Sequence, residues 1–185
     1  LKELSRNSQK LCDGLGVKRV AAILEANLRP VQIADSANLL EWRNKRSVRE
    51  GSLDSKFISK EEHLLWMEKI QNGENGIWLI YSEGGIDIGH CNCKFLSKTI
   101  VIWSFYIGEN FGDKGSGKRM LSFFLKYLFY DRAIEKVYAE VLRTNFKSKL
   151  IHKHFGFTQV KKNQNLLGYS LSKRQFRSRF YSLTG

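Results

Sequence analysis

The strongest hydrophobic pattern in the chain predicts a strand, a glycine-bearing loop and a helix between residues 99 and 130. Residues 99–107 form a near-continuous apolar run, which is typical of a central strand buried on both faces. Glycines interrupt the pattern over 108–117, and apolar positions at helical spacing resume over 118–130. A glycine loop that opens a helix offers backbone N–H groups and the positive end of the helix dipole to an anion, usually a phosphate. The pattern therefore predicts a phosphate-binding loop.

The hydrophobic pattern on either side predicts the strands and helices of one α/β (α+β) domain. The stretch 45–55 is polar, and we expect a mobile loop there. A capping box at 59–62 marks the start of a helix. Strands are expected over 28–33, 77–81, 86–95, 136–142, 158–160 and 166–171, and helices after the N-cap residue Asp35, from the capping box at Ser59 and over the segment that follows Asn145.

Three kinds of phosphate-binding loop carry glycines like those of residues 108–117, and each requires different residues around them. A dinucleotide fingerprint requires a third glycine where Met120 stands, and a P-loop requires a hydroxyl where Arg119 stands. The segment from Gly112 to Gly117 instead resembles the pyrophosphate loop of the GNAT N-acetyltransferases, Gln/Arg-x-x-Gly-x-Gly/Ala. It departs from that pattern at Gly112, which replaces the long polar residue. A simple glycine turn between strand and helix is the alternative.

A second motif follows the glycine loop at the expected distance. The segment 145–157, with Asn145, Gly156 and Phe157 in register, resembles the second cofactor motif of the same family. The resemblance implies a GNAT fold with a mixed central sheet flanked by helices, acetyl-CoA as co-substrate and no metal. It also implies that the strand before the loop diverges from its neighbour to hold the pantetheine arm. The residues assigned to acetyl-CoA are Phe105, Tyr106, Ile107, Gly112, Asp113, Lys114, Gly115, Ser116, Gly117, Lys118, Asn145 and Ser148.

Two residues are candidates for proton transfer. The family carries a tyrosine seven residues after the motif asparagine, and here that position is His152. We consider His152 as the acid for the leaving thiolate, although its ordinary pKa of about 6.5 leaves it mostly neutral at pH 7. The alternative is that the thiolate leaves with help from solvent. Glu109 is a candidate for relaying the proton of the amine, or else an exposed loop residue.

Two segments in the amino-terminal half resemble a narrower group within this family. The Trp-Arg-Asn segment and residues 58–63 resemble the sugar-nucleotide N-acetyltransferases of pseudaminic acid biosynthesis, which implies a UDP-linked amino-deoxy sugar as acceptor. On this hypothesis Arg43 pairs with the diphosphate, because its planar fork matches phosphate geometry. Asn44, His63 and Trp66 then supply hydrogen bonds and a stacking surface. Each has an ordinary structural alternative, as a helix-end, surface or core residue.

Composition limits the partners. The 185 residues carry a formal net charge of +13, but the Lys and Arg residues are spread along the chain. Phosphate-bearing ligands account for part of this charge, and nucleic acid is not the expected partner. No apolar run is long enough to span a membrane and no signal-peptide pattern is present, so we expect a soluble, cytoplasmic protein. The three cysteines are expected to be reduced and buried rather than bonded to a metal or to one another.

The termini are expected to lie outside the acetyltransferase domain, which we assign to 27–172. Residues 1–26 read as a helical extension that resembles the carboxyl end of the nucleotide-sugar hydrolase of the same pathway, and so suggests fusion to or association with one. Since the first residue is Leu1, we expect a piece of a longer product. Residues 173–185 read as a basic tail.

Two other functions remain open from the sequence. One keeps acetyl-CoA but replaces the acceptor by a protein amino terminus, as in ribosomal-protein acetyltransferases with similar Trp-Arg-Asn segments. The other is a degenerate domain that binds a partner without catalysis, which the replacements at Gly112 and His152 would favour.

Overall fold

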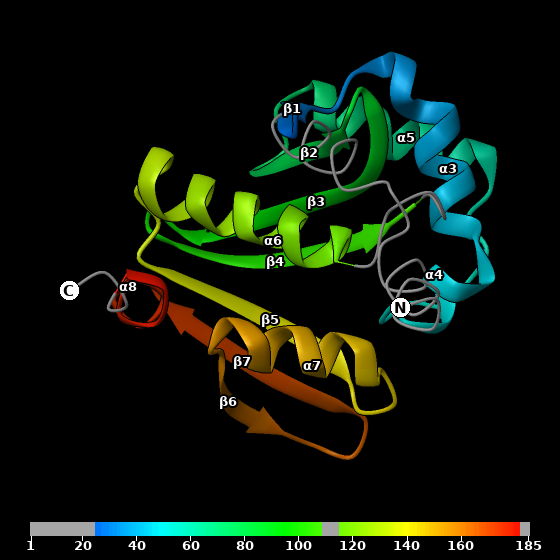
Figure 1. Cartoon of the computed structure of the whole chain (residues 1–185). Helices are drawn as coiled ribbons and strands as arrows, with labels where there is room; N and C mark the ends of the chain where they lie inside the picture. The colour runs from blue at the N-terminus through cyan, green and yellow to red at the C-terminus, as the bar shows by residue number, and fades with distance from the viewer. Residues whose placement is uncertain (1–24, 109–114, 182–185) are drawn as a thin grey trace, which may run out of the picture.

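The computed structural model describes residues 25–108 and 115–181, and its centre is a mixed β-sheet (Figure 1). Across the described residues the strands are β1 (Asn27–Pro30), β2 (Gly76–Glu83), β3 (Ile86–Ser97), β4 (Ile100–Ile107), β5 (Lys136–Leu142), β6 (Thr158–Lys162) and β7 (Leu166–Ser172). Their order is β1-β2-β3-β4-β5-β7-β6. Only β4 and β5 pair in parallel among these strands; the other pairs are antiparallel.

Helices cover both faces of the sheet. The helical segments are η1 (Ile33–Asp35), α3 (Ser36–Asn44), α4 (Arg46–Glu50), α5 (Lys60–Gln71), α6 (Ser116–Lys126), the π-helical turn η2 (Tyr127–Asp131), α7 (Phe146–Phe155) and α8 (Lys173–Tyr181). In Figure 1, α6 and α7 lie in front of the sheet. A second, smaller core forms where Leu39 and Met67 of α3 and α5 pack on Trp78 and Ile80 of β2. The sheet is thus buried on two sides, which explains the near-continuous apolar runs in its central strands.

The larger core lies between the sheet and α6. Met120, Leu121, Phe124 and Leu125 of this helix are fully buried, and they recur at the spacing of one helical face. The expected helix over 118–130 is confirmed in position but begins at Ser116 and passes into a π-helical turn. Because this helix is packed along its length, it fixes the direction in which its amino terminus points.

Two expectations from the sequence were wrong in detail. The polar stretch 45–55 contains the short helix α4, in which Val48 is buried. The basic segment after residue 172, expected as a tail, forms α8 over the part of it that the structure describes. The reason is an aromatic side chain: Phe176 is buried, with its ring centroid 5.3 Å from that of Phe129. One buried aromatic side chain anchors this otherwise basic segment.

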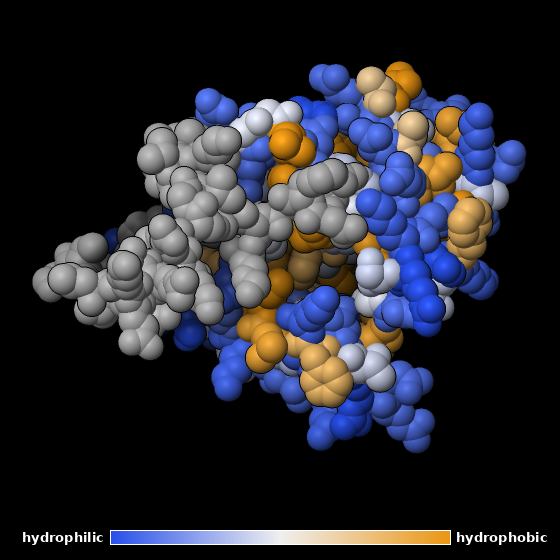
Figure 2. Space-filling model, turned by 45° about the vertical axis from the view of Figure 1, so that its right-hand side comes forward, coloured by the Kyte–Doolittle hydropathy of each residue, from blue (hydrophilic) through white to orange (hydrophobic). Residues whose placement is uncertain are grey.

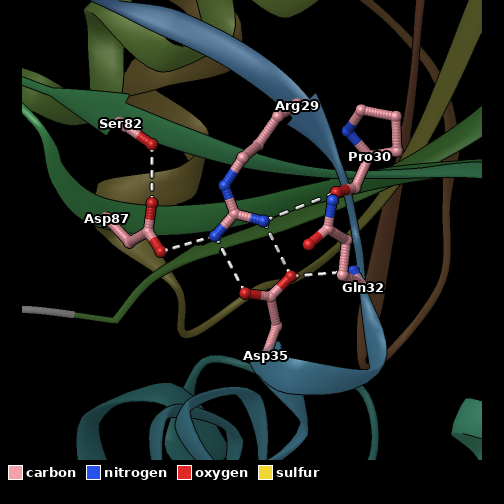
Figure 3. Close-up of polar contacts among 6 residues, drawn as sticks. All are labelled: Arg29, Pro30, Gln32, Asp35, Ser82 and Asp87. Carbon is pink, nitrogen blue, oxygen red and sulfur yellow. Dashed lines mark hydrogen bonds and ion pairs between the residues drawn. The ribbon is translucent and has the colours of Figure 1, made fainter.

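An ion-pair network holds the start of α3 against the sheet (Figure 3). Arg29 of β1 donates two hydrogen bonds of 2.8 Å to the Asp35 carboxylate and one of 2.6 Å to Asp87 of β3. The same carboxylate accepts the Gln32 N–H, so Asp35 closes the η1 turn rather than capping α3 with its side chain. Asp87 also accepts a hydrogen bond from Ser82. This network joins β1, β2 and β3 to the helix that leads into the candidate site.

The expected capping box is confirmed, since Ser59 and Glu62 exchange their side-chain and backbone hydrogen bonds. Cys91 and Cys93 are free and buried, as expected, on one face of β3. Cys12 lies outside the described residues. Within the ranges 25–108 and 115–181, no helix is both long and apolar enough to cross a membrane.

Candidate active site

The sheet opens between its two parallel strands. The pairing of β4 with β5 ends at Ile102 and Tyr138, although β4 continues to Ile107 and β5 to Leu142. The Gly108 N–H donates to Ile88 O, which places residue 108 on the β3 side of the ladder. Since backbone groups alternate along an antiparallel ladder, the amides of Phe105 and Ile107 face the opening. The expected divergence of this strand is therefore present.

The amino terminus of α6 lies over this opening. Gly115 has a φ of +109°, a left-handed conformation that a glycine adopts without strain, and the first helical hydrogen bond runs from Arg119 N–H to Gly115 O. A Cβ built on Gly117 would meet nothing closer than 3.7 Å, and its neighbours there are Ile107 and Ile151. Among the described residues, these side chains leave ordinary contact distance for an alanine at 117, so a glycine there fits the close approach of a ligand phosphate to the backbone.

A buried carboxylate fixes the first turn of α6. Glu83 accepts hydrogen bonds from Tyr81 at 2.7 Å, from Ser116 at 3.0 Å and from Arg119 at 2.7 and 2.9 Å. Although burial opposes it, this set of donors lowers the pKa of Glu83, and burial together with Glu83 raises that of Tyr81. The Ser116 hydroxyl, assigned to the cofactor, therefore binds Glu83, while Lys118 is exposed to solvent. Arg119 is paired with Glu83.

A cavity of about 680 Å³ adjoins the strand opening and extends to the face of the sheet that α3 and α5 cover. It lies between α3, α5 and the segment 51–58 on one side, and β3, β4, β5 and α7 on the other. Its volume falls in the range of small-molecule sites. In Figure 2, hydrophobic residues lie at the bottom of a hollow near the middle of the face, and hydrophilic residues border it on the right. The cavity contains side chains from both halves of the chain.

His152 does not have the arrangement expected of a proton donor. It is buried, and its ring Nδ1 lies 2.7 Å from Ser148 O, a carbonyl that can only accept. The Trp103 indole N–H, which can only donate, reaches His152 Nε2 at 3.2 Å. These partners fix a neutral imidazole with its proton on Nδ1, directed at its own helix. Burial also lowers the pKa of His152 to about 4.

Asn145 and Ser148 serve the local structure of α7. Asn145 is the N-cap, because its side-chain oxygen accepts the Ser148 N–H at 3.0 Å. Its side-chain nitrogen donates to Gly51 O at 3.0 Å and so ties α7 to the segment that borders the cavity. Both residues line the cavity, with Ser148 half-buried. Their side chains therefore shape this wall, and their assignment to acetyl-CoA stays a prediction.

The residues expected to bind the acceptor separate into two groups. Asn44 exchanges two hydrogen bonds with the backbone of Ile58, at 2.8 and 2.9 Å, and borders a different surface groove. Arg43 lines the cavity and donates to Asp54 O through Nη2, whereas its buried Nη1 has no partner among the described residues. Nη1 of Arg43 is therefore a buried donor without a partner in the part of the chain that the structure describes. The amide of Asn44 is already bound.

His63 and Trp66 lie together on the wall of the cavity. The His63 Nε2 is 2.8 Å from Ser36 O, a bond that joins α5 to α3, and burial lowers its pKa. Its ring centroid is 5.3 Å from that of Trp66, which is half-buried. The structure therefore brings Arg43, His63 and Trp66 to one cavity, and their assignment to the substrate stays a prediction.

The structure also brings residues into the cavity that the sequence analysis missed. His90 of β3 lines it, and Tyr106, assigned to acetyl-CoA, directs its side chain to the same face. A single histidine in a strand does not by itself indicate a functional site. Alternation with the buried residues of β3 would have placed it on the face of α3 and α5. Glu109, Gly112, Asp113 and Lys114 lie outside the described residues. Within that part of the chain, no cluster of metal-ligating side chains occurs.

The comparisons with known proteins agree with this geometry. A family model described as an acetyltransferase (GNAT) domain matches residues 28–170. The search of curated proteins found no significant match. Among solved structures, the chain is similar to the N-acetyltransferase PseH of Campylobacter jejuni, with a TM-score of 0.65 and 17% identity over 80% of this chain and 98% of that one. Another structure of PseH holds acetyl coenzyme A.

Two further solved structures are similar to this chain. Spermidine N-acetyltransferase from Vibrio cholerae, in complex with CoA and spermine, has a TM-score of 0.72 and 15% identity over 82% of this chain and 97% of that one. FdhC, a nucleotide-linked sugar GNAT, has a TM-score of 0.72 and 17% identity over 85% and 93%. These identities support the fold alone, whereas the family model covers most of the sequence. The chain belongs to the GNAT acetyltransferase family.

Proposed function

We propose that this acetyltransferase uses acetyl-CoA to acetylate the amino group of a nucleotide-linked amino-deoxy sugar, as in pseudaminic acid biosynthesis. The observation that carries the proposal is the cavity of about 680 Å³, which reaches the opening between β4 and β5 and places Arg43 beside His63 and Trp66. A peptide acceptor requires an open groove, whereas a sugar nucleotide requires a pocket with a cation for its phosphates. The resemblance of the Trp-Arg-Asn segment and the similarity to PseH and FdhC support the same acceptor.

The opening between the strands and the terminus of α6 fit the two parts of acetyl-CoA. The backbone of Phe105 and Ile107 would hydrogen-bond the pantetheine arm, and the amides near Gly117 would hold the pyrophosphate. Lys118 is exposed beside that terminus and adds a positive charge. The loop residues before Gly115 complete this assignment as expectations from the sequence.

Acetyl-CoA, when bound, supplies the acetyl thioester that a neutral amine attacks. The amide of Ile107 faces the opening and would donate a hydrogen bond to the carbonyl oxygen as its negative charge develops. Arg43 would hold the diphosphate through Nη1, and Trp66 would supply a stacking surface. His152 has no proton directed at the opening. We therefore propose that solvent protonates the thiolate, and the role of Glu109 as a proton relay stays a prediction.

The cytoplasm, where thiols such as Cys91 and Cys93 stay reduced, is the compartment we propose. The amino-terminal resemblance to a nucleotide-sugar hydrolase rests on residues 1–26, most of which lie outside the described ranges. Association with such a hydrolase remains a prediction from the sequence.

Two measurements test the function. Calorimetry with acetyl-CoA should give a saturable binding isotherm, which a partner-binding domain without catalysis need not show. A thiol-release assay should then compare a UDP-linked 4-amino sugar with spermidine and with a short peptide bearing a free amino terminus. We expect the highest kcat/KM for the amino sugar. A higher value for spermidine or for the peptide would overturn the proposed acceptor while leaving the acetyltransferase chemistry intact.

A further inference from the structure

His90 is the least satisfied polar side chain of the cavity. It is 1% exposed, and neither Nδ1 nor Nε2 has a hydrogen-bond partner among the described residues. Buried polar groups are paired in the great majority of cases, and leaving one unpaired costs stability. A histidine that is buried and lacks partners on both nitrogens therefore requires an explanation.

The surroundings of His90 direct the explanation toward a ligand. The residue lies opposite Tyr106 in the ladder of β3 and β4, and the two ring centroids are 5.2 Å apart. The Trp66 ring stands edge-on at 6.1 Å. All three side chains line the cavity, as does Arg43 with its free Nη1. The unpaired nitrogens thus adjoin the cavity that is proposed above to hold the acceptor.

We infer that His90 is an acceptor-contacting residue, whose neutral imidazole donates one hydrogen bond to the acceptor and accepts one from it. A neutral ring offers one N–H and one lone pair, which matches a hydroxyl or amino group of a sugar. Arg43 beside it matches the anionic part of the same molecule. The inference rests on the proposed function only for the identity of this acceptor.

The protonation state of His90 agrees with such a contact. Burial lowers its pKa to about 3, and the nearby charge of Asp35 opposes this only in part. The ring is therefore neutral at pH 7 and keeps a lone pair for the acceptor. It differs from His63 and His152, each of which has a ring nitrogen bonded to a backbone carbonyl.

The variant His90→Leu separates a ligand contact from a structural role. Leucine fills a similar volume without polar atoms, so the free protein should gain stability, with Tm rising by about 3 °C. In contrast, kcat/KM for the acceptor should fall by about 10- to 100-fold, because a site built for hydrogen bonds loses them. The KM for acetyl-CoA should change by less than about twofold. His90→Gln retains a donor and an acceptor and should recover part of the activity.

The assay uses whichever of the UDP-linked 4-amino sugar, spermidine and the amino-terminal peptide the wild-type enzyme acetylates fastest. The choice of acceptor tests the proposed function, and the ratio of variant to wild type tests His90. The control is His154→Leu, an exposed histidine on α7 outside the cavity, which should change neither Tm nor kcat/KM. A kcat/KM for His90→Leu within about twofold of wild type would overturn the inference.

Thermal unfolding distinguishes a structural role of His90 from a contact with the acceptor. A lower Tm for His90→Leu would show that His90 holds the fold together, and it would overturn the inference even if none of the three amines were acetylated. If His90→Leu did not fold, the same comparison would be made with His90→Gln, whose kcat/KM should then lie between wild type and a tenfold loss.

Discussion

The histidines that reach the cavity differ in what their ring nitrogens bind. His152 has a carbonyl on one nitrogen and an indole N–H on the other, whereas His90 has neither. Hydrogen bonds that satisfy both nitrogens fix the tautomer of a histidine and remove it from proton transfer. We therefore predict a structural role for His152, at the position of the family's tyrosine, and a substrate contact for His90, which has no partner among the described residues.

Replacing His152 by phenylalanine should destabilise the protein without changing its chemistry. The variant leaves the buried Trp103 indole N–H without an acceptor, which should lower the free energy of unfolding by about 1–3 kcal/mol. The limbs of the pH–rate profile should match those of the wild type, since no titrating donor is lost. Denaturant unfolding and the pH dependence of kcat measure the two effects. Disappearance of a limb in His152→Phe would restore this residue as the acid.

The sequence could place His152 but not determine its role. Its position in the second motif follows from the count of residues after Asn145, while its tautomer depends on Trp103, a residue of a different element. The same limit applies to Asn44, whose amide is used by the backbone of Ile58. Hydrogen-bond partners distant in sequence decide which polar side chains remain free, and no local pattern records them.

At the scale of single elements, the hydrophobic pattern predicted the strands, although the one expected over 28–33 ends at Pro30, and the spacing of Ser59 and Glu62 predicted the capping box. The hydrophobic pattern failed where polar or basic residues dominate. Among the side chains of α8 that the structure describes, only Phe176 is buried, so four Lys or Arg side chains obscure a helix that one aromatic residue anchors. The helix α4 is five residues long and contributes Val48 alone to the interior. Such elements depend on tertiary packing more than on their own pattern.

The Arg29 network should make the folded protein sensitive to acid. Hydrogen bonds from Arg29 lower the pKa of Asp35, so its stabilisation is complete above the ordinary carboxyl pKa of about 4. That stabilisation is lost as the pH falls through the folded-state value. Asp35→Asn should therefore lower the free energy of unfolding by about 2 kcal/mol at pH 7. It should also reduce the further loss between about pH 5 and pH 2.

Urea unfolding across this pH range measures both effects. Glu50→Gln is the matched control, because it breaks an exposed pair with Arg46 and should cause no measurable change. An Asp35→Asn protein as acid-sensitive as the wild type would show that other carboxylates set the acid limit.

At the scale of the whole molecule, the candidate site depends on where two strands separate. The end of β4–β5 pairing at Ile102 cannot be seen in the hydrophobic pattern, because β4 remains apolar to Ile107. The resemblance of two motifs predicted it, since the family binds its cofactor there. The cavity is lined by α3, α5, three strands and α7. Of its lining residues, the sequence predicted only those that the family resemblance named. His90, which the family motifs do not include, was not predicted.

Gly115 and Gly117, at the helix terminus above that opening, should respond differently to replacement by alanine. Gly115→Ala forces a side chain into a φ of +109° and should destabilise the free protein by about 1–2 kcal/mol. Gly117→Ala has ordinary space around its Cβ and should leave stability equal or slightly higher. If the pyrophosphate lies against that backbone, the added methyl group occupies its space, and calorimetry should show acetyl-CoA binding about tenfold weaker.

The two variants separate the fold from the ligand, because one should change stability and the other affinity. Unchanged acetyl-CoA binding by Gly117→Ala would place the pyrophosphate elsewhere, and the chemistry assigned to the strand opening would then need another anchor. A matching loss of stability in both variants would instead show that the space at Gly117 belongs to the fold. Only weaker binding by a stable Gly117→Ala protein is consistent with a phosphate held by the first turn of α6.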